Sequence, residues 1–466
     1  MDASAHFRDK RITLMGLGLL GRGVGDARYL AECGTELIVT DLKPRGELAE
    51  SVTQLESFKN ITFVLGQHRL EDFKNKDLIL KAAGVPLDSI YIAEAKKNDI
   101  PVRMSADLFA ELSGVACVGI TGTRGKSTVA QMIYEILKAS GKKVLLGGNM
   151  RGISTLALLK EVTSGHIAVL ELDSWQLQGW GEARMSPHIA VFTTLYQDHL
   201  NYYGSTSLTT RKEHPEQYLA DKANIFLYQK PEDTLILGAQ CAPTIIDKYG
   251  ENIEATTLVV DETKLPDTWV LRIPGIHNRY DAALALAAAR AMDISDEISR
   301  RALESFSSIS GRLELVREVN GVKIYNDTTA TTPEATLAAL SALESMSGRT
   351  TSQHDESKFS QPVRTSIILI MGGTDKKLDM NALLAKLTDM KRVILLAGTG
   401  TDRIKHELTG SMIYHTLSDA VIDAFAHAKA GDTILFSPAF TSFGMFKNEY
   451  DRGDQFVELV EKHYGK

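Results

Sequence analysis

Cysteine is scarce in this sequence. Only Cys33, Cys117 and Cys241 occur among 466 residues, with no Cys-x-x-Cys pair and no Cys/His spacing that suits zinc. This argues against a disulfide framework and against a structural zinc site. We therefore expect reduced, structural thiols.

Long apolar runs and an excess of basic residues are also missing. The first ten residues carry charges without the apolar stretch of a signal peptide, and no segment approaches the roughly 18 apolar residues of a membrane span. The formal net charge of -7 leaves no basic footprint for nucleic acid. We therefore expect a cytoplasmic protein that neither binds nucleic acid nor inserts into a membrane.

The length and the alternation of apolar segments predict an α/β protein of several domains. At about 150 residues per domain, 466 residues correspond to roughly three domains. Short apolar strands separated by helical patterns are typical of parallel, doubly wound sheets. Strands are expected at residues 11–15, 36–40, 78–80, 101–102, 115–120, 167–172, 188–194, 322–325, 366–371, 392–397 and 433–436. We predict domains at residues 1–113, 114–309 and 310–466, with a mobile surface loop at residues 347–365.

The first glycine motif, Gly16-Leu-Gly-Leu-Leu-Gly21, follows a strand and opens a helix, and Asp41 ends the next strand. This is the pattern of a dinucleotide site, in which helix N–H groups hold a diphosphate and the acid binds a ribose. The same turn also occurs simply to pack a helix close to a strand. The motif alone leaves a nicotinamide-dependent oxidoreductase as one alternative.

The second glycine motif, TGTRGKST at residues 121–128, lies between an apolar strand and an amphipathic helix. The strict P-loop pattern fails by one residue, because Ile120 stands where the first glycine is expected. Its glycines still permit an anion-wrapping backbone, its lysine suits β- and γ-phosphates, and its hydroxyls suit Mg²⁺. The alternatives are a surface turn or a regulatory nucleotide-binding protein without turnover. We predict that ATP is bound by Gly122, Thr123, Arg124, Gly125, Lys126, Ser127 and Thr128.

Eight motifs, in a characteristic order, resemble those of one enzyme family. They are TGTRGKST, GGN at 147–149, LELDSWQL at 170–177, QDHL at 197–200, GIHNRYD at 275–281, YNDTTAT at 325–331, GGTDK at 372–376 and SPAFTSFGMFKN at 437–448. The chain resembles the Mur ligases of peptidoglycan synthesis over nearly its whole length, and most closely the members that add glutamate.

The resemblance implies three domains. The first is Rossmann-like and binds the UDP part of the substrate, the second is a P-loop-type ATPase domain, and the third is Rossmann-like and binds the amino acid. No nicotinamide is then implied, because the first glycine loop would hold the UDP diphosphate and Asp41 would lie near the uracil. The residues implied for the UDP substrate are Gly18, Leu19, Leu20, Asp41, Asn149 and Gln176.

The resemblance also implies the reaction. The γ-phosphoryl group of ATP would pass to the carboxylate of UDP-N-acetylmuramoyl-L-alanine, and the amine of glutamate would attack the acyl phosphate to form an amide. Lys126, His199 and Lys222 are the implied catalytic residues, and Lys222 would be carbamylated to support Mg²⁺. Mg²⁺ would be placed by Ser127, Thr128, Glu171, His199 and Lys222. Without the resemblance, Glu171 could equally be structural, and His199 is more often a structural histidine than a ligand. Lys222 would ordinarily be a solvated helix lysine.

The remaining implied contacts belong to ATP and to glutamate. Asn278, Arg312 and Asp327 match ATP-side positions, although each could instead be an interior hydrogen-bonding residue or, for Arg312, form an interdomain salt bridge. The residues implied for glutamate are Thr331, Lys376, Ser442 and Phe443. We expect a monomer whose partners are these small substrates alone.

The chain departs from the family pattern at four positions. Arg124 and Asp281 replace asparagines, Thr329 replaces a lysine, and Glu449 stands at an aromatic position beside the amino-acid pocket. The pocket thereby loses a cation and gains an acid. We expect D-glutamate as the substrate, with L-glutamate as the alternative.

Overall fold

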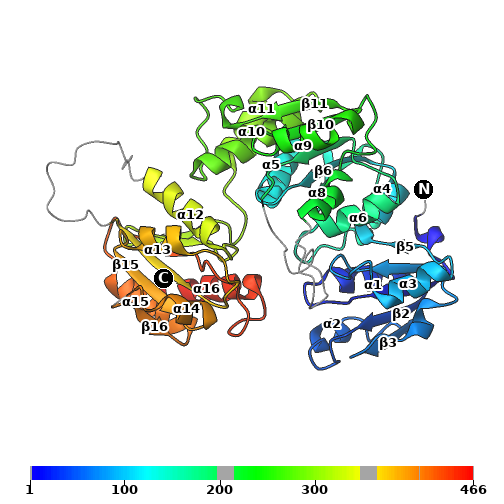
Figure 1. The fold of residues 1–466 in the computed structure, drawn as a ribbon, viewed down its shortest axis with the longest axis horizontal. Helices are drawn as coiled ribbons and strands as arrows, with labels where there is room; N and C mark the ends of the chain where they lie inside the picture. The colour runs from blue at the N-terminus through cyan, green and yellow to red at the C-terminus, as the bar shows by residue number, and fades with distance from the viewer. Residues whose placement is uncertain (1–2, 197–214, 347–364, 409, 465–466) are drawn as a thin grey trace. The chain divides into compact units, whose positions relative to one another are not determined.

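The computed structural model describes residues 3–196, 215–346, 365–408 and 410–464. Strands and helices alternate throughout, and three separate sheets form (Figure 1). The predicted α/β class is confirmed. The predicted loop at 347–365 lies outside the described residues except for Thr365. Among the described helices, none is both long and apolar enough to cross a membrane.

The first sheet has five parallel strands in the order β3-β2-β1-β4-β5. They are β1 (Arg11–Met15), β2 (Glu36–Asp41), β3 (Ile61–Leu65), β4 (Leu78–Lys81) and β5 (Val102–Arg103), with helices α1 (Arg22–Glu32), α2 (Ala49–Thr53), α3 (Ile90–Lys97) and α4 (Ser105–Ser113). The strand order reverses between β1 and β4. Ligands of such sheets bind at the carboxyl ends of the strands beside this reversal, where the first glycine loop begins.

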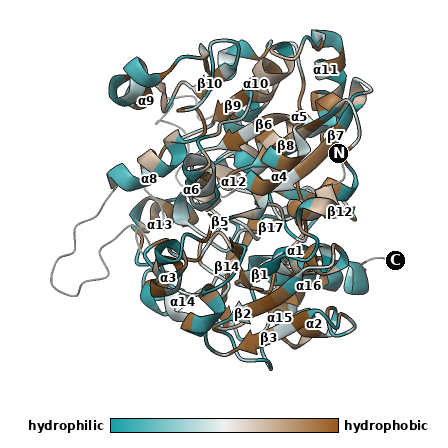
Figure 2. Ribbon diagram, turned by 90° about the vertical axis from the view of Figure 1, so that its right-hand side faces the viewer, coloured by the Kyte–Doolittle hydropathy of each residue, from teal (hydrophilic) through white to brown (hydrophobic). Residues whose placement is uncertain are grey.

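The second sheet has six parallel strands in the order β11-β10-β9-β6-β8-β7. They are β6 (Ala116–Thr121), β7 (Lys143–Gly148), β8 (His166–Glu171), β9 (Ile189–Phe192), β10 (Thr234–Gly238) and β11 (Thr256–Val260). The helices are α5 (Lys126–Ala139), η3 (Leu156–Lys160), α6 (Ser174–Glu182), α8 (Pro215–Ala223), α9 (Ala242–Tyr249), α10 (Ile276–Arg290) and α11 (Asp296–Ser305). Figure 2 shows the strands of this sheet largely in brown, as expected for strands covered on both faces.

Helix α5 shows why the sequence folds in this way. Val129, Met132, Ile133 and Ile136 recur at helical spacing and are all fully buried. Gly125 caps the helix with φ +84°, a left-handed conformation that glycine adopts without strain. The N-terminus of α5 is thereby fixed directly behind the second glycine loop.

The third sheet has six strands in the order β12-β13-β17-β14-β15-β16, parallel except for the antiparallel pair β12 and β13. They are β12 (Glu314–Val319), β13 (Val322–Asn326), β14 (Ile367–Gly372), β15 (Arg392–Leu396), β16 (Met412–Tyr414) and β17 (Thr433–Phe436). The helices are α12 (Pro333–Met346), α13 (Asn381–Leu387), α14 (Thr399–Ile404), α15 (Leu417–His427) and α16 (Glu449–Tyr464).

The contacts divide the chain into two compact units. One holds residues 1–268 and 280–303, with the first two sheets, and the other holds 269–279 and 304–466, with the third. Within the first unit α4 contacts both η3 and α6, and one apolar core includes Phe109, Leu156 and Trp180. The first two sheets therefore share a core.

Candidate functional site

The second glycine loop has the backbone geometry that its sequence predicts. Gly122 has φ +139°, and a Cβ there would lie 2.0 Å from Thr193 Oγ1. A Cβ on Gly125 would lie 2.5 Å from Asp281 Oδ1. Both positions therefore require glycine, for conformation and for space. Asp281, one of the departures from the family pattern, lies directly against the loop.

The end of β9 holds this loop in place. The Thr123 N–H donates to Thr194 O at 2.7 Å, and the Arg124 N–H donates to Thr194 Oγ1 at 2.9 Å. Thr123 Oγ1 donates to Tyr196 O at 3.2 Å. Thr193 and Thr194 thus support the loop, a role that the sequence pattern did not reveal because they lie about 70 residues away. Ser127 and Thr128 are half-buried in the first turn of α5.

Two lysines converge on one carbonyl of the loop. Lys126 Nζ donates to Gly122 O and to Thr123 O, both at 3.1 Å. Lys222 Nζ, from α8, donates to the same Gly122 O at 2.8 Å and to Thr121 Oγ1 at 3.3 Å. The Lys222 side chain is 1% exposed. The structure thus places Lys222 at the loop, while its carbamylation stays a prediction.

Glu171, at the end of β8, is a buried carboxylate whose two oxygens have different surroundings. Oε1 accepts a hydrogen bond from Asn149 Nδ2 at 3.3 Å, whereas Oε2 is buried without a hydrogen-bond partner. A buried carboxylate oxygen in this state is costly unless a cation neutralises it. Carboxylate oxygen is also the ligand type that Mg²⁺ prefers, so Glu171 fits the magnesium role that the resemblance implies.

Of the other implied metal ligands, the structure describes Ser127, Thr128 and Lys222. His199 lies outside the described residues. Within the described ranges, no three His, Cys, Asp or Glu side chains cluster tightly enough to hold a metal ion by themselves. A magnesium ion here would therefore rely on Glu171 together with hydroxyl groups of the loop and oxygens of the nucleotide, as is usual for this ion.

Gln176 and Asp173 form a capping box at the start of α6. The Gln176 N–H donates to Asp173 Oδ1 at 2.7 Å, and the Asp173 N–H donates to Gln176 Oε1 at 3.2 Å. This is the reciprocal arrangement that satisfies the first N–H groups of a helix. The structure therefore gives Gln176 a capping role, and its contact with the UDP substrate stays a prediction.

The first glycine loop is hydrogen-bonded to the acid predicted beside it. The Gly18 N–H donates to Asp41 Oδ2 at 3.0 Å and the Lys43 N–H to Oδ1 at 2.9 Å, while Ser51 Oγ donates to Gly18 O at 3.1 Å. Leu19 is exposed and Leu20 half-buried. Asp41 thus shapes the loop, and its contact with uracil stays a prediction.

In the second unit, Asp327 is a buried carboxyl at the end of β13. It accepts hydrogen bonds from Ser437 Oγ at 2.8 Å and from the Leu313 N–H at 3.0 Å. Burial raises its pKa to about 7, against the opposing effects of these hydrogen bonds and of the Arg312 charge. Asn278, also in this unit, donates from Nδ2 to Pro274 O at 2.5 Å.

The residues predicted for glutamate lie on loops that follow three neighbouring parallel strands, β13, β17 and β14. Lys376 Nζ donates to Thr331 Oγ1 at 3.2 Å, so these two meet from different loops. The N–H and carbonyl groups of Thr374 and Thr441 pair the β14 and β17 loops. Ser442 on the latter is buried, and Phe443 is 62% exposed.

Two residues support these loops in ways the sequence did not indicate. Arg452, fully buried in α16, donates to Thr328 Oγ1 at 3.1 Å, to Thr328 O at 2.7 Å and to Phe440 O at 3.1 Å. Burial lowers its pKa to about 10. Thr329, which replaces the lysine of the family pattern, donates from Oγ1 to Gly311 O at 2.9 Å. Arg452 thus joins two of the eight motifs.

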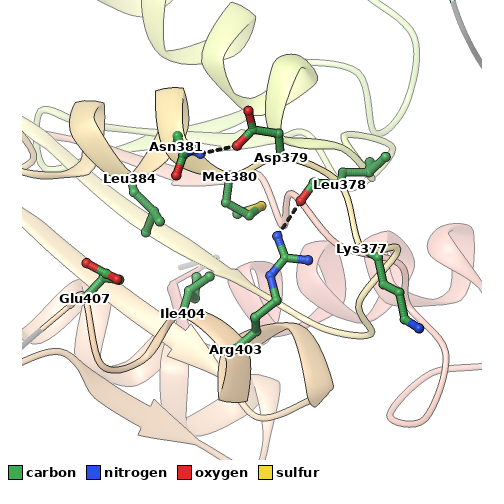
Figure 3. A pocket seen from close by; sticks show the side chains of 9 residues that line it. All are labelled: Lys377, Leu378, Asp379, Met380, Asn381, Leu384, Arg403, Ile404 and Glu407. Carbon is green, nitrogen blue, oxygen red and sulfur yellow. Dashed lines mark hydrogen bonds between the residues drawn. The ribbon is translucent and has the colours of Figure 1, made fainter.

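A hollow of about 460 Å³ is lined by the segment that directly follows Lys376 and by the end of α14 (Figure 3). Arg403 crosses it, donating from Nη1 to Asp375 Oδ1 at 2.8 Å and from Nη2 to Leu378 O. The lining consists of Lys377, Leu378, Asp379, Met380, Asn381, Leu384, Arg403, Ile404 and Glu407. Arg403 is thus already bound by Asp375.

Two family profiles match the chain, one over the second sheet and one over the third. The Mur ligase middle domain matches residues 120–273, and the glutamate ligase domain of Mur ligases matches residues 311–440. The chain belongs to the Mur ligase family.

Its relatives point to one branch of that family. Proteins named UDP-N-acetylmuramoylalanine--D-glutamate ligase are 33% identical in Roseiflexus sp. (strain RS-1), over 97% of this chain and 98% of that protein, and 32% identical in Geobacillus kaustophilus (strain HTA426), over 99% and 100%. The fold is also that of a UDP-N-acetylmuramate-alanine ligase from Thermotoga maritima, with TM-score 0.59 and 16% identity over 97% of this chain and 99% of that one.

Proposed function

We propose that the protein is an ATP-dependent, ADP-forming amide ligase that adds D-glutamate to UDP-N-acetylmuramoyl-L-alanine in peptidoglycan synthesis. The observation that carries this proposal is the full-length similarity to ligases named for that reaction. A nicotinamide-dependent oxidoreductase fits less well, because it leaves the Lys126 loop without a function.

The chemistry requires ATP because a carboxylate has no leaving group that an amine can displace. Transfer of the γ-phosphoryl group to the carboxylate gives an acyl phosphate and ADP. The glutamate amine then attacks the acyl carbon, loses a proton and expels inorganic phosphate as the amide forms. Positioning and charge neutralisation are the main contributions of a protein to phosphoryl transfer.

Residues of the first unit suit the phosphoryl-transfer half of this reaction. Lys126 brings a cationic side chain to the glycine loop, where it would oppose the negative charge of the transferring group, and Lys222 reaches the same Gly122 carbonyl. Magnesium, when bound, would reduce the repulsion between the γ-phosphate of ATP and the carboxylate of the UDP substrate. We propose Glu171, Ser127, Thr128, His199 and a carbamylated Lys222 as the residues that hold it.

Residues of the second unit suit the amino acid. A cation and hydroxyl donors are the groups that bind carboxylates, and Lys376, Thr331 and Ser442 supply them. We propose Phe443 as a further contact with glutamate, and Asn278, Arg312 and Asp327 as contacts with ATP. The proposed arrangement is three domains, for the UDP substrate, ATP and glutamate, in a cytoplasmic monomer.

The test is phosphate release that requires UDP-N-acetylmuramoyl-L-alanine, Mg²⁺ and D-glutamate together. Release that is indifferent to the UDP substrate would reject the ligase. Lys126→Ala should lower kcat/KM by about 10²–10³-fold, the usual effect of removing one group that stabilises developing charge. L-glutamate assayed in parallel tests the stereochemistry, and a preference for it would overturn the assignment of the D isomer.

A further inference from the structure

We propose that Arg22 is a positioning residue that links the UDP-substrate loop to the magnesium carboxylate Glu171 through the side-chain amide of Asn149. The inference rests on the proposed function, because that function makes Glu171 a metal ligand. Arg22 belongs to neither of the glycine motifs and to none of the residues that the sequence singled out.

Three hydrogen bonds connect the two sites. Arg22 is the first residue of α1, directly after the Gly16–Gly21 loop, and its Nη1 donates to Asn149 Oδ1. Asn149 Nδ2 then donates to Glu171 Oε1 at 3.3 Å, and the Asn149 N–H donates to Glu171 O at 2.7 Å. The chain of contacts runs from the loop of the first sheet to the end of β8 in the second.

The chemistry of these groups allows only one orientation of the amide. A guanidinium has only donors and an ionised carboxylate has only acceptors. The Asn149 oxygen must therefore face Arg22, and its NH₂ group must face Glu171. Without Arg22 the amide could rotate and place its oxygen against the carboxylate, where the two would repel each other.

The position of Arg22 on its helix supports a specific role. A cation in the first turn of a helix is electrostatically unfavourable, because the helix dipole is positive there. The same face of α1 packs against the segment between β7 and η3, because Asp26 accepts a hydrogen bond from Ser154 Oγ at 2.6 Å. The Gly152 N–H also donates to Leu20 O at 3.1 Å. Arg22 therefore acts from a fixed position.

Asn149 engages one oxygen of Glu171 and leaves the buried Oε2 for the cation. Residues that orient a metal ligand in this way typically change metal affinity by 10–100-fold when they are removed. We call the hydrogen-bonded series Arg22–Asn149–Glu171 the relay. Because the relay begins beside the Gly16–Gly21 loop, binding of the UDP substrate and binding of the metal should favour each other. Such coupling is reciprocal.

The experiment compares Arg22→Met with Arg28→Met. This control lies on the exposed face of the same helix, where Arg28 hydrogen-bonds to Gln54. Mn²⁺ binding to the full-length protein with ADP, measured by electron paramagnetic resonance, reports the metal site without turnover. Calorimetric titration with UDP-N-acetylmuramoyl-L-alanine, with and without Mn²⁺, reports the coupling.

We expect Arg22→Met to weaken Mn²⁺ binding by about 10–100-fold and to reduce the coupling, while Arg28→Met changes neither. Arg22→Gln, which can present either its oxygen or its NH₂ group, should behave like Arg22→Met and serves if that variant melts too low. Arg22→Lys, a donor only, should restore part of the affinity.

Unchanged Mn²⁺ affinity in both Arg22→Met and Arg22→Gln would overturn the proposal. Weaker UDP-substrate binding with unchanged Mn²⁺ affinity would also overturn it, because Arg22 would then contact the diphosphate instead. Wild-type protein that binds Mn²⁺ with ADP but releases no phosphate with the three substrates would reject the proposed function and leave the relay itself measurable.

Discussion

Replacing Glu171 with glutamine should stabilise the protein while removing its magnesium response. Oε2 of Glu171 is buried without a hydrogen-bond partner, and the residue is 3% exposed. A buried polar atom in that condition is destabilising by about 1–3 kcal/mol, and by more when it is charged. Glutamine keeps the shape and the oxygen that Asn149 contacts. Its NH₂ group would take the unpaired place of Oε2, so the stabilisation comes from removal of the buried charge.

The expected gain is about 1–3 kcal/mol in the free energy of unfolding without Mg²⁺. At roughly 2 °C per kcal/mol, the midpoint of thermal unfolding should rise by about 2–6 °C. For the wild type, Mg²⁺ with ADP at 100 times its dissociation constant should add about 2.7 kcal/mol. Glu171→Gln should lose most of this increment, since the carboxylate is missing.

Differential scanning calorimetry with ADP, with and without Mg²⁺, measures both effects, and Glu161→Gln on the exposed surface is the control. The reasoning is refuted if Glu171→Gln melts below the wild type without Mg²⁺. It is equally refuted if the variant keeps the full magnesium increment, because Glu171 would then hold no metal.

Three further predictions concern other parts of the protein. Gly125→Ala places a Cβ 2.5 Å from Asp281 Oδ1 at φ +84°. The resulting strain of about 1–3 kcal/mol should weaken ATP binding, which a calorimetric titration measures. Unchanged ATP affinity would show that this position does not require glycine. Asp327 has a folded pKa of about 7 against an ordinary 3.8, so its contribution to stability is full below about pH 4 and lost as the pH rises through 7. Urea unfolding at pH 5 and pH 8 should show this loss in the wild type, and Asp327→Asn should flatten it. Arg452→Lys keeps a cation but cannot donate in three directions, so it should lower the unfolding free energy by about 2 kcal/mol and raise the KM for glutamate more than it lowers kcat.

Some of the strands could be predicted from the sequence. β1 and β17 were predicted with their observed bounds, because isoleucine, leucine and methionine runs end at clear turn signals. β7 was not predicted, since it ends in two glycines that read as a turn, and the three-residue β16 has too few residues to form a pattern. The strands β3, β10, β11 and β12 were not predicted either.

The candidate site could be predicted from the residues alone only where its residues are consecutive in the sequence. The glycine loop could be interpreted as a phosphate site because its residues are consecutive. Lys222 could be placed there only through the family resemblance, since nothing in its own helix indicates that it reaches Gly122. Arg22 and Arg452 were missed because Asn149 and Thr328, which they contact, lie more than 100 residues away, and no local pattern records such a contact.

The shared core of the first two sheets bears on how this enzyme could be recombined with its relatives. A chimera cut near residue 113 would expose apolar faces around Phe109 and Leu156 that another enzyme's side chains would have to fill. Cuts near residues 268 and 304 follow the division between the compact units instead. Exchanging residues 304–466 should therefore be tolerated better than exchanging residues 1–113.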